Sequence, residues 1–320
     1  MVQEFDPDPQ LVLFGAYGLI YGLSSQVVVK VKRLPRKSLN SDDDLEAEQA
    51  GFARLAGGDG LHKQIPCPYI VPVFYQAMGT ATFMLRAQYD LRSVIHQEHD
   101  RSDGSRLAYR YDPVRTARWM GQLCGAVAFL VETHKLVHGD LRPDNVLVDS
   151  NDNLRLADLG ASWPVGQRLQ VAAEPWGRKL GVLDGLPPTE DHEYGLAGAR
   201  SETFALGSIY YSLLRGHYPY AHEQYDFFTL MGKFQRKEFP ALDPATTPGD
   251  AIVARCWAGA YADDATSVSA LEQEFRNMGD GTEWYRFPLE DAAWFAETQQ
   301  ACRAWAESGQ LEKVLANRTR

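Results

Sequence analysis

The spacing of hydrophobic positions changes along the chain, from strand-like in the first part to helix-like in the second. Residues 11–34 contain three β-rich runs, separated by glycines and by a short polar turn, and this pattern predicts an antiparallel meander. Residues 69–75 and 81–86 read as two further strands. We therefore expect the first part of the chain to form an antiparallel sheet.

An amphipathic helix is predicted between the third and fourth of these strands. Ser41 is a typical N-cap residue, and the acidic residues after it suit the first turn of a helix. Leu45, Phe52 and Leu55 then recur on one face, and Glu48 falls on that same face. The pattern thus places a carboxylate on the inward side of the helix.

From about residue 113 the hydrophobic spacing is mainly helical. The predicted helical segments are 113–135, 201–214, 227–239, 249–261 and 267–278. We therefore expect an α+β fold in which a small β-rich part precedes a larger helical part, with the boundary near Gln88.

Residues 281–320 form a third segment, in which tryptophans alternate with charged residues. Trp284, Trp294 and Trp305 belong to it. Because apolar side chains of folded chains are usually buried, we expect an amphipathic helix packed on the helical part rather than a free partner-binding tail. The expected division of the chain is 1–87, 88–280 and 281–320.

Composition and charge exclude several classes of protein. The 320 residues are 45% hydrophobic, enough for a sizeable core, and carry a formal net charge of −10. A surface for nucleic acid or for an anionic membrane is normally basic, so neither partner is expected. The four cysteines form no CxxC pair, and the longest uncharged apolar runs, 121–131 and 203–214, are too short to span a bilayer. We expect a soluble protein of the cytoplasm or nucleus.

Charged and amide side chains are concentrated in the sequence HGDLRPDN, residues 138–145, between two strand-like runs. Such a segment can be a simple polar turn, because Gly, Asp and Asn all favour turns. However, Asp158 follows the next strand, and the predicted hairpin 146–156 would bring it to the same end as Asn145. An amide oxygen beside a carboxylate is a pair of hard ligands of the kind that Mg²⁺ prefers.

These motifs resemble those of the protein kinase superfamily, whose catalytic loop is H-R-D-L-x-x-x-N and whose metal-binding turn is D-F-G. HGDLRPDN and DLG stand in their places. The resemblance implies that Asp140 accepts the proton of the attacking hydroxyl and that Arg142 stabilises the transferred phosphate. It also implies that Asn145 and Asp158 hold Mg²⁺, whereas His138 is expected to be structural.

The β-rich part resembles the superfamily as well. In FGAYGLIYG, Gly15 and Gly18 match two glycines of the phosphate-covering loop, and Leu13 takes the place of the first one. VVVK resembles V-A-I-K, which implies that Lys30 reaches the α- and β-phosphates of ATP, and Glu48 is suited to hold that lysine. The implied nucleotide contacts are Leu13, Gly15, Gly18, Ile20, Val28, Lys30, Leu85, Ala87 and Leu147.

The resemblance runs from about residue 11 to residue 279. It implies a bilobal protein-kinase-like fold, with a small antiparallel β-rich N-lobe that holds one main helix and a larger helical C-lobe. Pro188-Thr189-Glu190 resembles the A-P-E that closes the activation segment, and Glu202 stands where an Asp is usual. Gly139 departs from the superfamily, because it replaces the Arg of H-R-D and so argues against switching by a phosphate on the activation loop.

The function implied is ATP- and Mg²⁺-dependent transfer of the γ-phosphate to serine or threonine hydroxyls of protein substrates. Two alternatives stay open: a small-molecule phosphotransferase like the aminoglycoside and choline kinases, which share HGDL-x-P-x-N, and a non-catalytic pseudokinase scaffold. The segment 161–187, with Arg168, Arg178 and Lys179, leans basic and would favour acidic substrates. The sequence makes no prediction of oligomeric state.

Overall fold

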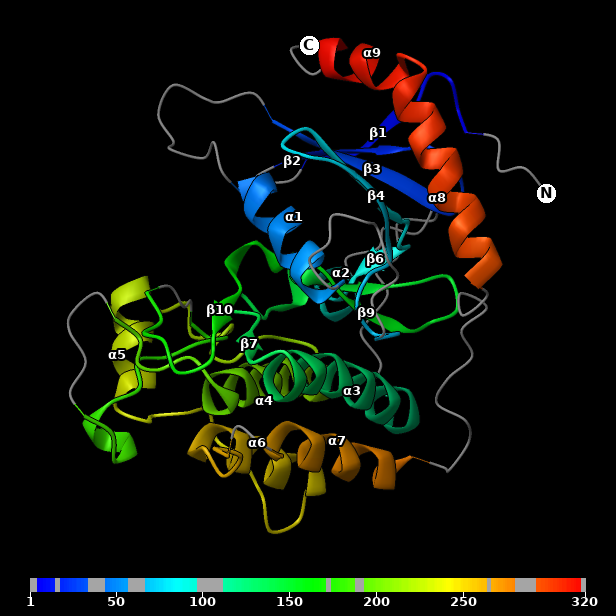
Figure 1. Cartoon of the computed structure of the whole chain (residues 1–320). Helices are drawn as coiled ribbons and strands as arrows, with labels where there is room; N and C mark the ends of the chain where they lie inside the picture. Colours follow the sequence, from blue (N-terminus) through cyan, green and yellow to red (C-terminus); the bar gives the residue numbers. More distant parts are fainter. Residues whose placement is uncertain are drawn as a thin grey trace.

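Two lobes make up the part of the chain that the computed structural model describes (Figure 1). The described residues are 5–14, 18–33, 44–56, 67–96, 112–170, 174–187, 193–263, 266–279 and 292–317. The smaller lobe is built on a sheet and the larger one mostly on helices, so the expected α+β, bilobal fold is confirmed. The division of the chain at residues 87 and 280 stays a prediction.

A five-stranded antiparallel sheet forms the N-lobe. Its strands are β1 (Gln10–Phe14), β2 (Gly18–Gly22), β3 (Val27–Lys32), β4 (Val73–Ala77) and β5 (Ala81–Leu85), in the spatial order β1-β2-β3-β5-β4. The predicted meander is therefore present. The strand predicted over 69–75 begins later, at Val73, because Ile70 makes only an isolated bridge, to Leu156 of the C-lobe.

Helix α1 (Asp44–Leu55) lies between the sheet and the C-lobe. Leu45, Glu48 and Phe52 are buried, as the helical spacing predicts. At Gly51 the helix approaches the C-lobe so closely that a Cβ atom would lie 2.8 Å from Cβ of Leu159. The helix therefore touches the segment that directly follows Asp158.

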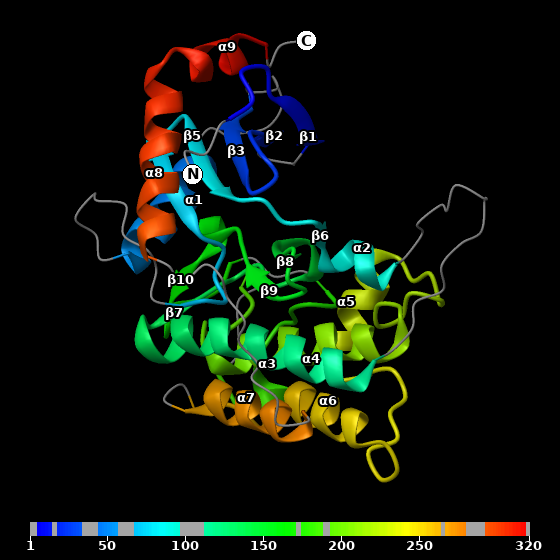
Figure 2. The same cartoon turned by 90° about the vertical axis from the view of Figure 1, so that its right-hand side faces the viewer.

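The helices of the C-lobe form two layers, with α3 and α4 nearer the sheet and α6 and α7 beneath them (Figure 2). α3 packs against α7, and α4 packs against α6. The C-lobe helices are α2 (Leu91–Ile95), α3 (Pro113–Ala128), α4 (Ala199–Arg215), α5 (Phe227–Gln235), α6 (Pro248–Ala258) and α7 (Ser267–Met278). α3 ends before its predicted limit because the chain continues as a π-helical turn, Phe129–Thr133. Within the described ranges, no helix has the length and apolar character needed to cross a membrane.

Short strands line the surface of the C-lobe that faces the N-lobe. β6 (Tyr89–Asp90), β8 (Val146–Val148) and β9 (Leu154–Leu156) form one small sheet, and β7 (Leu136–Val137) and β10 (Trp163–Pro164) form another. In the β8–β9 hairpin, Val146 pairs with Leu156. The residues before β8 and after β9 therefore lie at the same end, as the sequence predicts.

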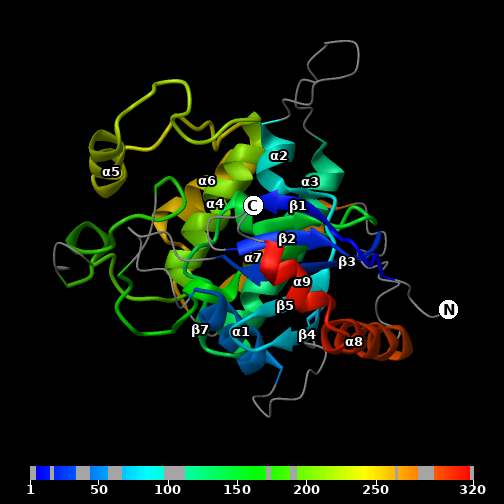
Figure 3. The same cartoon turned by 90° about the horizontal axis from the view of Figure 1, so that it is seen from above.

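The C-terminal segment folds as α8 (Ala292–Glu307) and α9 (Gln310–Asn317). The expectation that it packs on the C-lobe is wrong: α8 runs along β4 of the N-lobe (Figures 1 and 3). Nε2 of Gln299 donates to the carbonyl oxygen of Phe74 at 3.0 Å. The ring centroids of Phe83 and Trp305 lie 5.8 Å apart, and Phe83 is fully buried.

Strand alternation explains this packing. Thr82 of β5 contacts α1, so its neighbour Phe83 must point to the opposite face of the sheet. That face carries large apolar side chains, and burying them from water is favourable. Helix α8 covers this face of the sheet, because its Phe295 packs against Phe74 at a ring-centroid distance of 5.4 Å.

Candidate active site

Lys30 and Glu48 form a nearly buried ion pair in the N-lobe. Nζ of Lys30, on β3, donates to Oε2 of Glu48, on α1, at 2.6 Å, and the two side chains are 14% and 3% exposed. Burial raises the pKa of Glu48, and the ammonium of Lys30 opposes this shift. The charge of Asp158 also raises the pKa of Glu48, and α1 packs against the turn that follows Asp158. The expected contact between Lys30 and Glu48 is thus present.

Asp140 and Asn145 are joined across the loop 138–145. Nδ2 of Asn145 donates to the carbonyl oxygen of Asp140 at 2.8 Å and to its carboxylate Oδ2 at 2.9 Å. Because a backbone carbonyl only accepts hydrogen bonds, this contact fixes which way the amide of Asn145 points. The side chain of Asp140 remains 39% exposed, so a substrate hydroxyl can reach the carboxylate.

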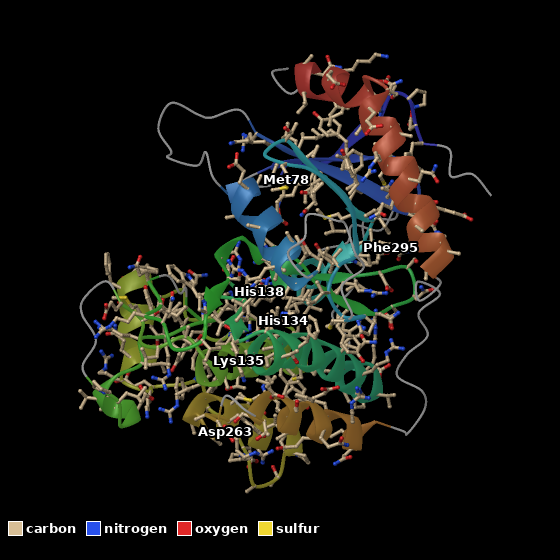
Figure 4. All side chains as sticks on the ribbon, viewed as in Figure 1. Met78, His134, Lys135, His138, Asp263 and Phe295 are labelled. Carbon is tan, nitrogen blue, oxygen red and sulfur yellow. The ribbon has the colours of Figure 1, made fainter. Side chains whose placement is uncertain are left out.

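His138 is fully buried where the two lobes meet (Figure 4) and anchors this loop. Its Nε2 lies 2.8 Å from the carbonyl oxygen of Ala157, so Nε2 carries the proton, and Nδ1 accepts from the N–H of Asp140 at 3.3 Å. The N–H of His138 donates to Oε2 of Glu202 at 2.9 Å. Both ring nitrogens are therefore committed to holding the loop.

Glu202 and Gly139 determine the path of the backbone after His138. Burial raises the pKa of Glu202, and the N–H groups of His138 and Gly139 oppose this shift. Gly139 has a φ of +79°, and a Cβ atom there would lie 2.1 Å from the carbonyl oxygen of Ala161. Only glycine fits this position, so the departure from H-R-D is a requirement of the local backbone.

Asn145 and Asp158 fit a divalent cation by their chemistry. Oδ1 of Asn145 accepts no hydrogen bond from the described residues, because the amide is held through its nitrogen. Oδ1 of Asp158 accepts from the N–H of Gly160 at 3.3 Å, and Asp158 has a left-handed backbone, with φ 61° and ψ 77°. The N–H of Ala157 donates to the carbonyl oxygen of Asn145 at 2.9 Å, which brings the two segments together. Amide and carboxylate oxygens are the ligands that Mg²⁺ prefers.

Arg142 lies beside the carboxylate of Asp140. Its Nε is 3.5 Å from Oδ2 of Asp140 and 3.8 Å from Oδ2 of Asp144. This nitrogen makes no hydrogen bond to the described residues. Asp144 instead accepts from Nη1 of Arg92 at 3.1 Å. With its side chain 40% exposed, Arg142 can therefore offer its guanidinium to a phosphate group.

The linker after β5 and the strand β3 supply residues of the expected nucleotide pocket. Val28 and Leu85 are buried. The N–H of Arg86 donates to the carbonyl oxygen of Gln26, and the N–H of Gln88 donates to that of Val148. Between them, the N–H of Ala87 has no partner within the described part of the chain. This donor can therefore serve a ligand.

The other expected nucleotide contacts lie on β1, β2 and β8. Ile20 and Leu147 are half-buried against the core, and Gly18 begins β2. Leu13 pairs with Ile20 across the β1–β2 register, but its side chain is 53% exposed. Gly15 lies outside the described residues, as does the segment Pro188-Thr189-Glu190.

The expectation of a basic substrate approach over 161–187 loses one of its three charges, that of Arg178. Arg168 pairs with Glu193. Arg178 is 1% exposed and donates to both carboxylate oxygens of Asp184, at 2.9 and 2.5 Å. Burial would raise the pKa of Asp184, but hydrogen bonds from Arg178 and from the N–H of Gly181 lower it to about 2. Arg178 is therefore not free to select an acidic substrate, whereas the side chain of Arg168 stays 60% exposed beside Glu193.

Gln49 is a buried polar residue that the motifs do not identify. It is 0% exposed and follows Glu48 on α1. Its separation from Leu45 and from Phe52, four and three residues, places it on the inward face of the helix. The periodicity that selects Glu48 therefore also selects Gln49.

Comparison with known proteins agrees with this geometry. The chain matches the family model described as the protein kinase domain over residues 25–257. It is 33% identical over 140 residues to CBL-interacting protein kinase 8 of Oryza sativa subsp. japonica, covering 42% of this chain and 29% of the relative. It is 26% identical over 223 residues to a dual specificity mitogen-activated protein kinase kinase of Caenorhabditis elegans, covering 68% of this chain and 57% of the relative.

A third relative is CBL-interacting serine/threonine-protein kinase 8 of Arabidopsis thaliana, which is 32% identical over 102 residues, 32% of this chain and 22% of the relative. The chain thus spans between 22% and 57% of the length of these three proteins. The family model covers most of the chain and includes both the Lys30–Glu48 pair and the loop 138–145. The chain therefore belongs to the protein kinase domain family.

Proposed function

We propose that the protein transfers the γ-phosphate of ATP to serine or threonine hydroxyls of protein substrates, with Mg²⁺ as the metal. The observation that carries this proposal is the assembled pair of contacts Lys30–Glu48 and Asp140–Asn145. A scaffold without catalysis has no need to retain both contacts, one in each lobe. The assembled contacts therefore favour an active enzyme over a pseudokinase.

Phosphoryl transfer requires positioning and charge neutralisation more than covalent chemistry. Lys30, held by Glu48, would bind the α- and β-phosphates of ATP. Asp140 would orient the substrate hydroxyl and accept its proton, while Arg142 would bind the transferred phosphate from the side of Asp140. Asn145 and Asp158 would hold Mg²⁺, which neutralises phosphate charge when it is bound.

Protein substrates are favoured over small molecules by the relatives, whose printed names are those of protein kinases. One is named as a serine/threonine kinase and one as a dual specificity kinase. Transfer to serine and threonine is therefore the most economical assignment for this chain. The alternative, a small-molecule phosphotransferase, is tested in the same experiment.

The test is transfer of radiolabelled γ-phosphate from ATP in the presence of Mg²⁺. The protein is offered mixed dephosphorylated proteins in one arm and a panel of aminoglycosides and amino alcohols in the other. We expect label on protein, and phosphoamino acid analysis should find it on serine and threonine. Label on the small molecules alone would replace the proposal by the phosphotransferase alternative.

Matched variants separate catalysis from contamination and from misfolding. Asp140→Asn removes the proposed base and should lower kcat by about 10²-fold or more. Asp144→Asn makes the same chemical change in the same loop, at a side chain that pairs with Arg92, and should retain most of the activity. Equal loss in both variants would indicate disruption of the loop and would remove the support for Asp140 as the base.

A further inference from the structure

Gln49 makes a set of hydrogen bonds that connect α1 to the β4–β5 hairpin. Its Nε2 is 2.9 Å from the carbonyl oxygen of Ala81 and 3.2 Å from that of Ala77. Its Oε1 accepts from the N–H of Gly79 at 2.8 Å. One side-chain amide, fully buried, thus binds both strands of the hairpin and the turn between them.

The same amide reaches the strand that lies beside Lys30. Nε2 of Gln49 is 3.2 Å from Oγ1 of Thr82, and Thr82 is the residue of β5 that pairs with Lys30 of β3. Lys30 in turn donates to Glu48, the neighbour of Gln49. The contacts therefore close a ring that runs from β3 through α1 to β5 and back to β3.

Other contacts dock the helix on the same hairpin. Nε2 of Gln76, on β4, lies 3.4 Å from the backbone carbonyl oxygen of Gln49. At Gly79 in the hairpin turn, a Cβ atom would lie 3.0 Å from Oε1 of Glu46, another residue of α1. Met78, at the tip of the hairpin, lies beside α1 in Figure 4. The hairpin and the helix thus meet along the side of α1 that carries Glu46 and Gln49.

We propose that Gln49 is a positioning residue, which holds α1 so that Glu48 stays in contact with Lys30 without a nucleotide present. A helix with only apolar contacts can slide or rotate on a sheet, whereas directional hydrogen bonds to backbone groups define one register. Losing the amide would remove a donor from the buried carbonyl oxygen of Ala81 and leave the part-buried N–H of Gly79 without its acceptor, which is costly, so the helix would shift. Glu48 would then release Lys30.

The consequence is specific to the phosphates of the nucleotide. Lys30 is expected to contact the phosphates of ATP and not the adenosine part, so the loss of its position should weaken ATP binding and spare adenosine binding. A side chain that only stabilises the fold would affect both ligands alike. The inference rests on the proposed function only in requiring that the site binds ATP through Lys30.

The experiment measures dissociation constants of Mg·ATP and of adenosine for the full chain and for Gln49→Met, which keeps the length of the side chain but removes its polar atoms. We expect ATP binding to weaken between about tenfold and a hundredfold, because this is the effect of losing one charge-assisted hydrogen bond. Adenosine binding should be unchanged. The control is Gln122→Met, which removes a buried amide that binds Asn153 and Leu154 of the C-lobe. This variant should change neither constant.

Three outcomes are separable. If the wild type binds adenosine as tightly as ATP, Lys30 makes no phosphate contact and the proposed function itself fails. If the wild type prefers ATP and Gln49→Met retains that preference, the positioning role is overturned and the proposed function stands. If Gln49→Met acts through Lys30, it should have no further effect on the preference in a Lys30→Met background, and an additive loss would contradict the inference.

Hydrogen exchange on the unmodified protein gives a second test that does not depend on a variant. Without nucleotide, the amides of residues 48–52 should be as strongly protected as those of β5, because the helix is bonded to that strand. Fast exchange in this part of α1, with β5 protected, would show a helix that is not held and would overturn the proposal.

Discussion

At position 139 the backbone decides which residue can stand in the loop 138–145. The φ of +79° is strained for any residue except glycine, and the carbonyl oxygen of Ala161 occupies the space of a Cβ atom. Gly139→Ala is expected to lower the free energy of unfolding by roughly 2–4 kcal/mol, from backbone strain together with the clash. Urea unfolding measures this change.

Gly166→Ala is the matched control for this prediction. Gly166 also has a positive φ, +85°, but nothing lies within 4 Å of its Cβ position. Strain alone should therefore cost about 1–2 kcal/mol. Equal effects of the two substitutions would show that the close approach of Ala161 is not a constraint on the loop.

Single residues were predictable where a motif or a period identifies them. The spacing of α1 selects Glu48, and its contact with Lys30 is present. The partner of Asp144 was not predictable, because Arg92 is far away in sequence and only the fold brings the two side chains together. The glycine at 139 was visible as a departure, but its cause, the position of Ala161, depends on tertiary structure.

At the scale of elements, α8 completes the N-lobe by covering the face of the sheet opposite to α1. Trp305→Ala should destabilise the lobe by about 3–5 kcal/mol, because it leaves a cavity beside the buried ring of Phe83. Hydrogen exchange should show faster exchange in β4 and β5 and little change in the C-lobe helices α4 and α6. Glu297→Ala, at an exposed position of the same helix, should leave exchange unaltered.

Faster exchange confined to the C-lobe in the Trp305→Ala variant would contradict this packing. The sequence predicts a buried amphipathic tail from its tryptophans, but amphipathicity does not identify the surface that receives it. The receiving surface depends on the alternation along β5, where Thr82 and Phe83 face opposite sides. The alternation along β5 therefore shows which residues share a face of the sheet. It identifies the face that receives α8 only once the position of α1 is known.

At the scale of the whole molecule, Asp184 joins separate parts of the C-lobe. Its carboxylate binds Arg178 and lies 3.1 Å from Nζ of Lys237, just beyond α5, while its carbonyl oxygen accepts from Arg200 of α4. Asp184→Asn would leave Arg178 buried without its counter-charge. The expected loss of stability at neutral pH is about 3 kcal/mol.

The pKa of the Asp184 carboxyl predicts how the stability of the protein depends on pH. The pKa of Asp184 is lowered in the folded protein from 3.8 to about 2, so its stabilising effect is complete above the unfolded value and is lost as the pH falls toward 2. The difference in unfolding free energy between wild type and Asp184→Asn should therefore be constant from pH 7 to about pH 5 and shrink below about pH 4. A difference that grows on acidification would contradict the assignment.

We propose that the whole chain is an active protein kinase. The most direct measurement is the initial rate of γ-phosphate transfer from Mg·ATP to protein serine and threonine, for wild type and Asp140→Asn purified side by side. We expect steady transfer by the wild type and a rate lowered about 10²-fold or more in the variant. Equal rates, or nucleotide binding without transfer by the wild type, would contradict it.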